Sequence, residues 1–261
     1  MFQVVPRSGR GLLILTAAMV IAASGCGSST ATASPSAFAS QSSQPSASAS
    51  PTDGSAGLDG AASALANLTS YKFRLTVVGG DLSDTLSSLP NAPTDGVFKI
   101  SGTYIMLPDK AADITVAGAL QEISLAGNDY QDNGMTGSFT QMDTGATTLV
   151  DQVSPAAVYA SFDFTTGFDL VASQPTDPIG TDHYHAGDAA VAQFAAIAGV
   201  ADANWTADVW IAQNGGYPAR ISIVATASAT DKTIVYERTF DVTDVNAATN
   251  KVTAPTNVTG A

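Results

Sequence analysis

Two histidines lie two residues apart in the segment His183-Tyr184-His185, and the carboxylates of Asp182 and Asp188 lie near them in the sequence. Residues two apart on a strand point to the same face, so both imidazoles would lie side by side. Imidazole and carboxylate groups are suitable ligands for Zn²⁺ or Cu²⁺. Such a pair is more often part of a solvated strand, and we therefore expect no metal and no cofactor.

A second candidate for chemistry is Asp143-Thr144-Gly145, which resembles the signature of aspartic proteases. In those enzymes two carboxylates share one proton and activate water. A single copy would require a homodimer, with Ile197-Ala198-Gly199 as the later apolar segment. The alternative is a loop in which Asp143 or Thr144 begins a helix. The sequence contains no nucleophile elbow, phosphate-binding loop or dinucleotide fingerprint, and we expect no enzymatic activity.

Cys26 is the only cysteine, so it cannot form a disulfide within the chain. Arg7 and Arg10 are followed by an apolar stretch over 12–23, which is shorter than the roughly 20 residues of a membrane-spanning helix. Ala23-Ser24-Gly25-Cys26 resembles a lipobox, with Ala23 where Leu is usual. We expect residues 1–25 to be a lipoprotein signal peptide and Cys26 to carry the lipid anchor, including palmitate. An ordinary signal peptide followed by a chance cysteine is the alternative.

Residues 26–57 continue from this cysteine as a Ser-, Ala- and Pro-rich segment. Such a composition cannot bury enough apolar surface to offset its ordering entropy, so we expect a flexible tether. Residues 58–261 suit a single domain with a substantial core. The predicted location is the extracytoplasmic side of the cell membrane, where the lipid anchor holds the protein.

Charge narrows the possible partners. The chain has 10 Lys and Arg and 23 Asp and Glu, and two of the basic residues precede position 11, which leaves a mature net charge of −15. A nucleic-acid partner is therefore not expected. The acidic surface should also repel anionic headgroups, so the anchor must hold the protein at the membrane.

Short segments with alternating apolar residues dominate the domain. Tyr71, Phe73, Leu75 and Val77 share one face of a predicted strand, and Leu58, Leu65 and Leu68 have helical spacing. We predict strands over 71–77, 97–107, 112–117, 120–126, 128–132, 138–142, 168–172, 181–186, 206–212, 219–227 and 233–242, and helices over 58–68, 146–153, 155–162 and 188–198. The predicted fold class is α+β, with a strongly curved antiparallel sheet and helices packed on its concave side.

Several segments resemble the mycobacterial LppX/LprG group of lipoproteins, which share a half-barrel with the LolA and LolB carriers. The segments are Ser70-Tyr71-Lys72-Phe73-Arg74, Gly127-Asn128-Asp129-Tyr130, Ser154-Pro155-Ala156-Ala157-Val158, Ala207-Asp208-Val209-Trp210-Ile211 and Gly215-Gly216-Tyr217-Pro218-Ala219-Arg220. The resemblance implies an apolar cavity that binds the acyl chains of a lipid or glycolipid and carries or presents them without bond chemistry. A membrane transporter is then a candidate partner.

The candidate cavity lining consists of apolar residues on predicted strands and helices. They are Phe73, Leu75, Val77, Phe98, Ile100, Tyr104, Met106, Leu149, Val153, Val158, Phe162, Val209, Ile211, Ile221 and Ile223. The same alternation fits the wall of a cavity or a filled core. With a filled core, the protein would instead be a non-enzymatic surface interaction module on the same scaffold.

Overall fold

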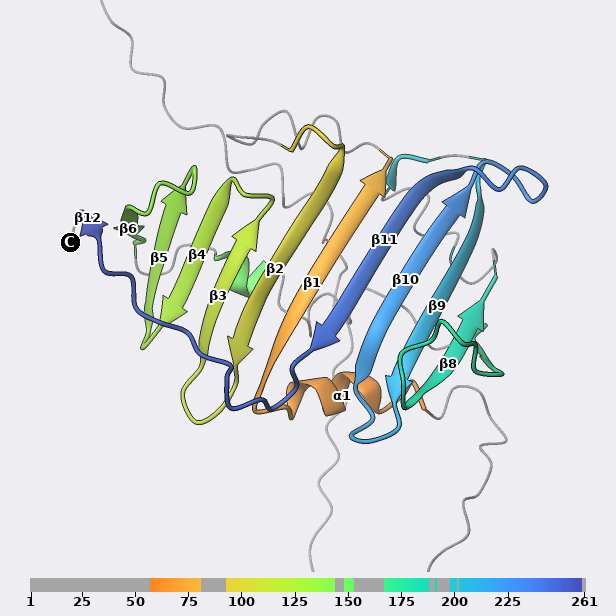
Figure 1. Cartoon of the computed structure of the whole chain (residues 1–261), viewed down its shortest axis with the longest axis horizontal. Coiled ribbons are helices and arrows are strands. Elements are labelled where there is room, and N and C mark those ends of the chain that lie inside the picture. Colours follow the sequence, from red (N-terminus) through yellow and green to blue (C-terminus); the bar gives the residue numbers. More distant parts are fainter. Residues whose placement is uncertain are drawn as a thin grey trace, which may run out of the picture.

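One sheet organises the molecule. The computed structural model describes residues 57–80, 93–143, 148–152, 167–187, 191, 198–200 and 202–259. In these ranges twelve strands form a single sheet in the order β12-β6-β5-β4-β3-β2-β1-β11-β10-β9-β8-β7 (Figure 1). The elements are α1 (Ala61–Ala66), β1 (Ser70–Gly79), β2 (Val97–Ile105), β3 (Ala111–Val116), β4 (Leu120–Leu125), β5 (Asn128–Asn133), β6 (Phe139–Gln141), α3 (Leu149–Gln152), β7 (Asp169–Val171), β8 (Thr181–Ala186), β9 (Asn204–Ala212), β10 (Pro218–Thr226), β11 (Ile234–Thr243) and β12 (Val258–Thr259).

The sheet is strongly curved and does not close, because β12 and β7 remain at opposite edges. All neighbouring strands pair antiparallel except β12, which runs parallel to β6. The expected half-barrel fold class is thus confirmed. Its centre joins distant parts of the chain, since β1 pairs with β2 on one side and with β11 on the other.

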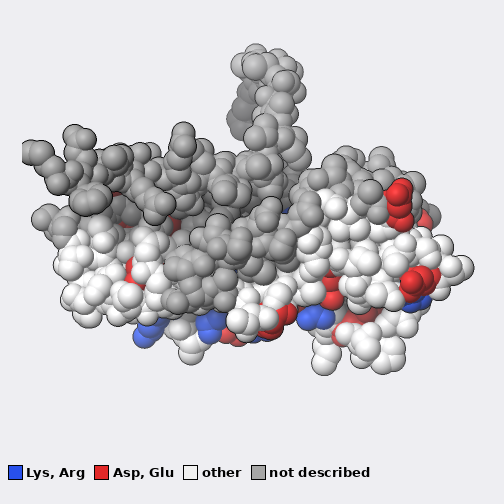
Figure 2. Space-filling model, turned by 90° about the horizontal axis from the view of Figure 1, so that it is seen from above, with Lys and Arg blue, Asp and Glu red and all other residues white. Residues whose placement is uncertain are grey.

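Alternation along the strands gives the sheet two different faces. On β1, Phe73, Leu75 and Val77 are buried, whereas Lys72 and Arg74 point to the opposite side. We call the side with Phe73 the apolar face and the other the outer face. Figure 2 shows Lys, Arg, Asp and Glu side chains together along the lower side of the molecule. This division is the one expected for a sheet that covers a core on one side only.

Helix α1 lies at the end of the sheet where β1 begins (Figure 1). The predicted helix over 58–68 is shorter than expected, but Leu58, Leu65 and Leu68 are buried and belong to the same core as the apolar face. Asn67 ends the helix, and its backbone N–H bonds to carbonyls of the last turn. The apolar spacing therefore identified the correct contacts although helix boundaries were overextended.

Gly102 interrupts the apolar residues of β2, and its surroundings explain why glycine is needed there. A Cβ atom at this position would collide with the carbonyl oxygen of Asp113 on β3 and lie 2.9 Å from Cε1 of Phe73. Glycine therefore permits close approach of neighbouring groups rather than a turn.

A C-terminal segment that the sequence did not predict crosses the outer face. Residues 244–259, which we call the strap, follow β11 and pass in front of the lower ends of β1 to β5 to reach β12 (Figure 1). Asn246 Oδ1 accepts hydrogen bonds from the backbone N–H groups of Thr69 (2.8 Å) and Ser70 (3.3 Å) and from the Thr69 hydroxyl (2.7 Å). At the far end, Asn257 Nδ2 donates to Ser138 Oγ at 2.9 Å. Both ends of the strap are thus tied to the sheet.

Some expectations fall outside the described residues. These include the signal peptide 1–25, Cys26 and nearly all of the tether, the helix over 155–162 and most of the helix over 188–198. None of the helices in the described part of the chain is long and apolar enough to cross a membrane.

Candidate functional site

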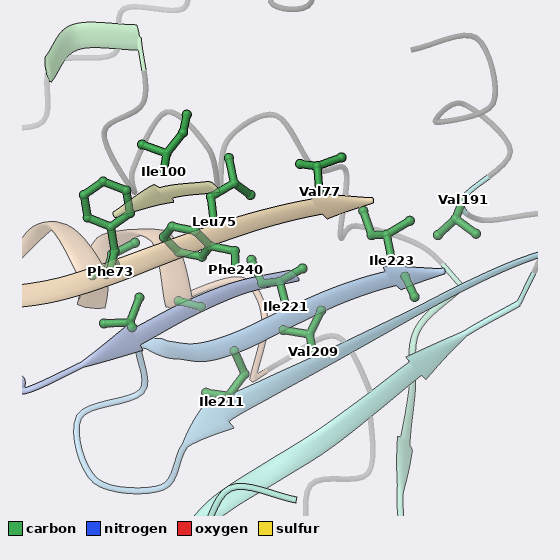
Figure 3. Close-up of a cluster of buried hydrophobic side chains, with 14 of the residues drawn as sticks. Phe73, Leu75, Val77, Ile100, Val191, Val209, Ile211, Ile221, Ile223 and Phe240 are labelled. Carbon is green, nitrogen blue, oxygen red and sulfur yellow. The ribbon is translucent and has the colours of Figure 1, made fainter. Parts of the chain in front are cut away.

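The apolar face brings together most residues that the sequence nominated for lipid contact. In Figure 3 labelled side chains from β1, β2, β9, β10 and β11 stand on one side of the sheet. The described nominees are buried, apart from Met106, which is half-buried just beyond β2 and packs against the same core. The buried nominees are Phe73, Leu75, Val77, Phe98, Ile100, Tyr104, Leu149, Val209, Ile211, Ile221 and Ile223. Val153, Val158 and Phe162 lie outside the described residues.

Further residues on this face were not in the nominated set. Ile114 and Val116 on β3 extend it past β2, while Phe240 and Val242 on β11 fill the position between β1 and β10. Trp205 on β9 is only 2% exposed and lies 5.6 Å from the Tyr236 ring, measured between ring centroids. Alternation along 233–242 and 112–117 was a sufficient signal for the residues on β3 and β11.

An aromatic cluster occupies the face near α1. The Tyr104 ring lies 5.6 Å from Tyr71 and 5.5 Å from Phe73, and Phe73 lies 6.1 Å from Phe240. Burial raises the pKa of the Tyr71 hydroxyl, since an apolar environment disfavours the phenolate. These rings supply a large apolar surface with a stable, neutral ionisation state.

Two polar side chains on this face position the short helix α3. The Tyr104 hydroxyl donates a hydrogen bond to the carbonyl oxygen of Val150 at 2.9 Å. The backbone N–H of Val150 donates to Oε1 of Glu122 at 3.1 Å. Glu122 faces the same side as Ile114, its partner across β3 and β4, and is only 1% exposed. Both hydrogen-bonding groups of one peptide residue are therefore held by the sheet, which places Leu149 in the core.

A cation also faces the apolar side. Arg238 on β11 is directly opposite Val77 on β1 and Ile223 on β10, and directly opposed residues share a face of an antiparallel sheet. Burial lowers the pKa of its guanidinium, and the Tyr236 hydroxyl, two residues away, partly offsets this through a hydrogen bond. The sequence analysis missed Arg238 because it selected apolar residues only.

The two histidines of the metal hypothesis lie on the outer face. They share a face as predicted, and both contact Asp208 Oδ1 on β9: His183 through Nε2 and His185 through Nδ1, each at 2.8 Å. The His183 ring stacks on Trp210, with centroids 4.6 Å apart. Within the described residues no group of three or more His, Cys, Asp or Glu side chains is arranged to hold a metal ion. The pair forms a structural hydrogen-bonding cluster around one carboxylate.

The protease hypothesis centred on Asp143. This residue is exposed and follows β6. The Met142 N–H donates a hydrogen bond to the carbonyl oxygen of Asp129 at 2.8 Å, which holds the chain in place just after β6. Asp143 is therefore away from the buried apolar face, and Thr144 and Gly145 lie outside the described residues. In the single chain Asp143 is an exposed carboxylate, whereas aspartic proteases use two carboxylates that share one site.

Comparison with known proteins gives distant structural similarity. No protein-family model and no curated protein matches the chain. Similar solved structures include the lipoprotein LppX from Mycobacterium tuberculosis, with 15% sequence identity, a TM-score of 0.45 and coverage of 75% of this chain and 96% of that chain. LprF from Mycobacterium bovis has 11% identity and a TM-score of 0.36, covering 76% and 95%. A LolA superfamily protein from Nitrosomonas europaea has 9% identity and a TM-score of 0.25, covering 75% and 93%. The first two belong to the lipoprotein group that the sequence motifs resemble.

Proposed function

We propose that this protein is a lipid-binding carrier, anchored through Cys26 on the extracytoplasmic side of the cell membrane, that performs no bond chemistry. The observation that carries the proposal is the continuous apolar face over β3, β2, β1, β11, β10 and β9. Its proposed ligand is a lipid or glycolipid whose acyl chains lie against this face. Its proposed lining is the set of residues nominated from the sequence, to which Val153, Val158 and Phe162 also belong.

Acyl chains need no directional contacts. Transfer of a methylene group from water to an apolar environment contributes about 0.8 kcal/mol, so about ten methylenes supply about 8 kcal/mol. Leucine, isoleucine, valine and phenylalanine side chains are sufficient for such binding. The face offers these residues across several neighbouring strands, from Ile114 on β3 to Val209 on β9.

The helix α3 is well placed to separate from the sheet when a ligand binds. Its polar contacts with the face include the hydrogen bonds of Tyr104 and Glu122 to Val150. Breaking two such bonds costs about 1–3 kcal/mol in total, less than the gain from burying several methylenes. Binding would thus exchange protein–protein contacts for lipid contacts.

The anchor and tether keep the carrier near its source of lipid. A flexible chain of about 30 residues has an end-to-end distance of roughly 30 Å, which gives the domain access to the membrane surface while Cys26 holds it there. A membrane transporter remains a proposed delivery partner. A Cys26→Ser protein should be released or remain unprocessed, and its recovery in the membrane with an attached acyl chain would disprove the anchor assignment.

Ligand extraction tests the carrier proposal directly. The full chain is expressed in a bacterial host, purified from the membrane, and extracted with organic solvent for mass spectrometry. We expect acyl lipids in a fixed ratio to protein, and uptake of labelled lipid from vesicles after the bound lipid has been removed. Absence of both co-purified lipid and uptake would refute the proposal and favour an interaction module with a filled core.

A further inference from the structure

His183 on β8 lies between two carboxylates that come from different parts of the chain. Its Nε2 is 2.8 Å from Oδ1 of Asp208 on β9, and its Nδ1 is 3.3 Å from Oδ2 of Asp177. Asp177 belongs to residues 172–180, which connect β7 to β8 and which we call the β7–β8 loop. The side chains of His183 and Asp177 are only 10% and 6% exposed. One imidazole ring therefore joins this loop to the outer face of the sheet.

The β7–β8 loop is built around the carboxylate of Asp177. The backbone N–H of Gln174 donates to Oδ2 of Asp177 at 2.6 Å, and the N–H of Asp177 donates to the carbonyl oxygen of Gln174 at 3.0 Å. Burial disfavours the charge of Asp177, but the N–H of Gln174 and the side chains of Trp210 and His183 outweigh burial and lower its pKa. Asp177 is therefore a charged carboxylate at neutral pH.

The number of protons on His183 decides whether both contacts can be favourable at once. A neutral imidazole has one N–H, so it donates to one carboxylate and turns a lone pair towards the other. An imidazolium has two N–H groups and can form charge-assisted hydrogen bonds with both carboxylates. Histidine is the side chain whose charge changes between about pH 5 and 8, a range in which carboxylates are normally charged. The contact between His183 and Asp177 should therefore depend on pH.

Loss of one proton should release Asp177 rather than Asp208. Asp208 is held within the sheet by the pairing of β9, and its Oδ1 also contacts Nδ1 of His185 at 2.8 Å. Asp177 belongs to a loop next to β7, which is the edge strand and pairs with β8 at three positions. The contact of His183 with Asp177 is also longer than its contact with Asp208. The loop can thus move away at lower cost than the strand.

Neighbouring strands carry the other titratable and charged groups of this part of the outer face. They are Asp169 on β7, His185 on β8, Asp208 on β9, Arg220 on β10 and Asp241 on β11. Trp210 on β9 lies between His183 and Arg220 in the register, and Arg220 bonds the carboxylate opposite it on β11 at 2.6 Å. In the part of the chain that the structure describes, only Asp177 and Asp208 form ion-pair contacts with His183.

We propose that protonation of His183 fastens the β7–β8 loop to the outer face and that loss of this proton releases the loop. The fastened loop binds one proton more than the released loop, so a rise in pH favours release. Release removes one attachment of the edge strand β7, which directly follows Phe168 in the core. The sheet edge is thus held more firmly at acid pH than at slightly alkaline pH. This device requires no ligand, so it is separate from the proposed lipid binding.

Hydrogen–deuterium exchange of the full chain, followed by mass spectrometry, measures this release. The reporters are the amides of Gln174 and Asp177, which are hydrogen-bonded in the fastened loop. After correction for the intrinsic effect of pH on exchange, we compare their opening at about pH 5.5 and about pH 8. We expect at least about a tenfold increase, the factor that corresponds to the loss of one hydrogen bond between charged groups. Amides of β10 and β11 are the internal reference and should show no such increase.

Three variants assign the response to a residue. A carboxamide in Asp177→Asn can accept from an Nδ1–H and donate to a bare Nδ1, so the loop should stay closed at both pH values. His183→Gln removes the titrating ring, so exchange of the loop should no longer depend on pH. His185→Gln is the matched control, because it removes the other imidazole that contacts Asp208 and should keep the pH response of the parent. Thermal unfolding identifies a variant that does not fold, and if His183→Gln fails, Asp177→Asn decides the question.

Each outcome supports or overturns the proposal. Equal corrected exchange of the loop at the two pH values in the parent would overturn it. An unchanged pH response in Asp177→Asn or in His183→Gln would show that another group titrates and would also overturn it. Loss of the response in His185→Gln would transfer the role to His185. A response that is present in the parent and in His185→Gln, and absent in the other two variants, would support it.

Discussion

Replacement of Asn246 isolates what the strap contributes to stability. Its Oδ1 accepts two backbone N–H groups and one hydroxyl at the start of β1, and its backbone has a φ of 54°. Asparagine tolerates this left-handed conformation better than alanine, for which it costs about 1–2 kcal/mol. Loss of three hydrogen bonds with partial replacement by water costs about 2 kcal/mol. Asn246→Ala should therefore lower the free energy of unfolding by about 3 kcal/mol.

Two companion variants divide this effect. Asn246→Gly removes the acceptor but suits the positive φ, so it should cost about 2 kcal/mol. Asn246→Asp retains the acceptor oxygens and should remain within about 0.5 kcal/mol of the parent. Chemical denaturation measures these differences, and thermal unfolding should show a drop of roughly 6–12 °C for Asn246→Ala. If Asn246→Gly were as stable as the parent, the hydrogen bonds of the strap would not stabilise the fold and the reasoning would fail.

Three further predictions concern the apolar face and one loop. Ala207→Phe on the apolar face should abolish lipid uptake without loss of stability if that face borders a cavity; a cost of about 1–3 kcal/mol in denaturation would indicate a filled core. Tyr104→Phe removes the bond to Val150, so it should cost about 1 kcal/mol and accelerate lipid exchange between vesicles; unchanged exchange would argue against movement of α3. Burial disfavours the charge of Asp132, but bonds from the N–H groups of Thr136 and Gly137 outweigh it and lower its pKa. The stabilisation by the charged Asp132 side chain should be fully present above the pKa of about 3.9 in the unfolded chain, and it should be lost as the pH falls through the lower pKa in the folded chain. Asp132→Asn should therefore weaken the dependence of the free energy of unfolding on acid pH, measured by chemical denaturation.

Alternation of apolar residues was enough to predict most of the sheet. The strands over 71–77 and 181–186 and the three C-terminal strands are present with boundaries within two residues. Each of these strands has one buried and one solvated face. Alternation in the sequence therefore indicates both that the segment is a strand and which of its side chains face the core. Leu58, Leu65 and Leu68 were identified for the same reason, because their spacing matches one side of a helix.

The residues that sequence reasoning missed depend on long-range geometry. Arg238 occupies the same face as Tyr236 and Phe240, but a search for apolar residues passes over a charged one. Strand β12 has only two residues and forms because Asn257 and Val258 meet β6 about 120 positions earlier in the chain. The two histidines were predicted to share a face. The carboxylate that both of them contact belongs to Asp208 on the neighbouring strand β9, and the spacing along β8 alone does not indicate it.

The order of strands has a consequence for how the chain folds. Strands β1 to β5 can pair in the order in which they appear, but the other edge of β1 is filled only by β11, near the end of the sequence. Thr69 and Asn246, which meet beside this junction, are 177 positions apart. Closing so long a loop is slow compared with forming hairpins. If the chain crosses a membrane from its N-terminus, as the proposed signal peptide would require, β1 emerges early and keeps an open hydrogen-bonding edge until almost the whole domain has followed. Such an edge promotes aggregation, so we expect export of this protein to depend on periplasmic-type chaperones or on rapid completion of translocation.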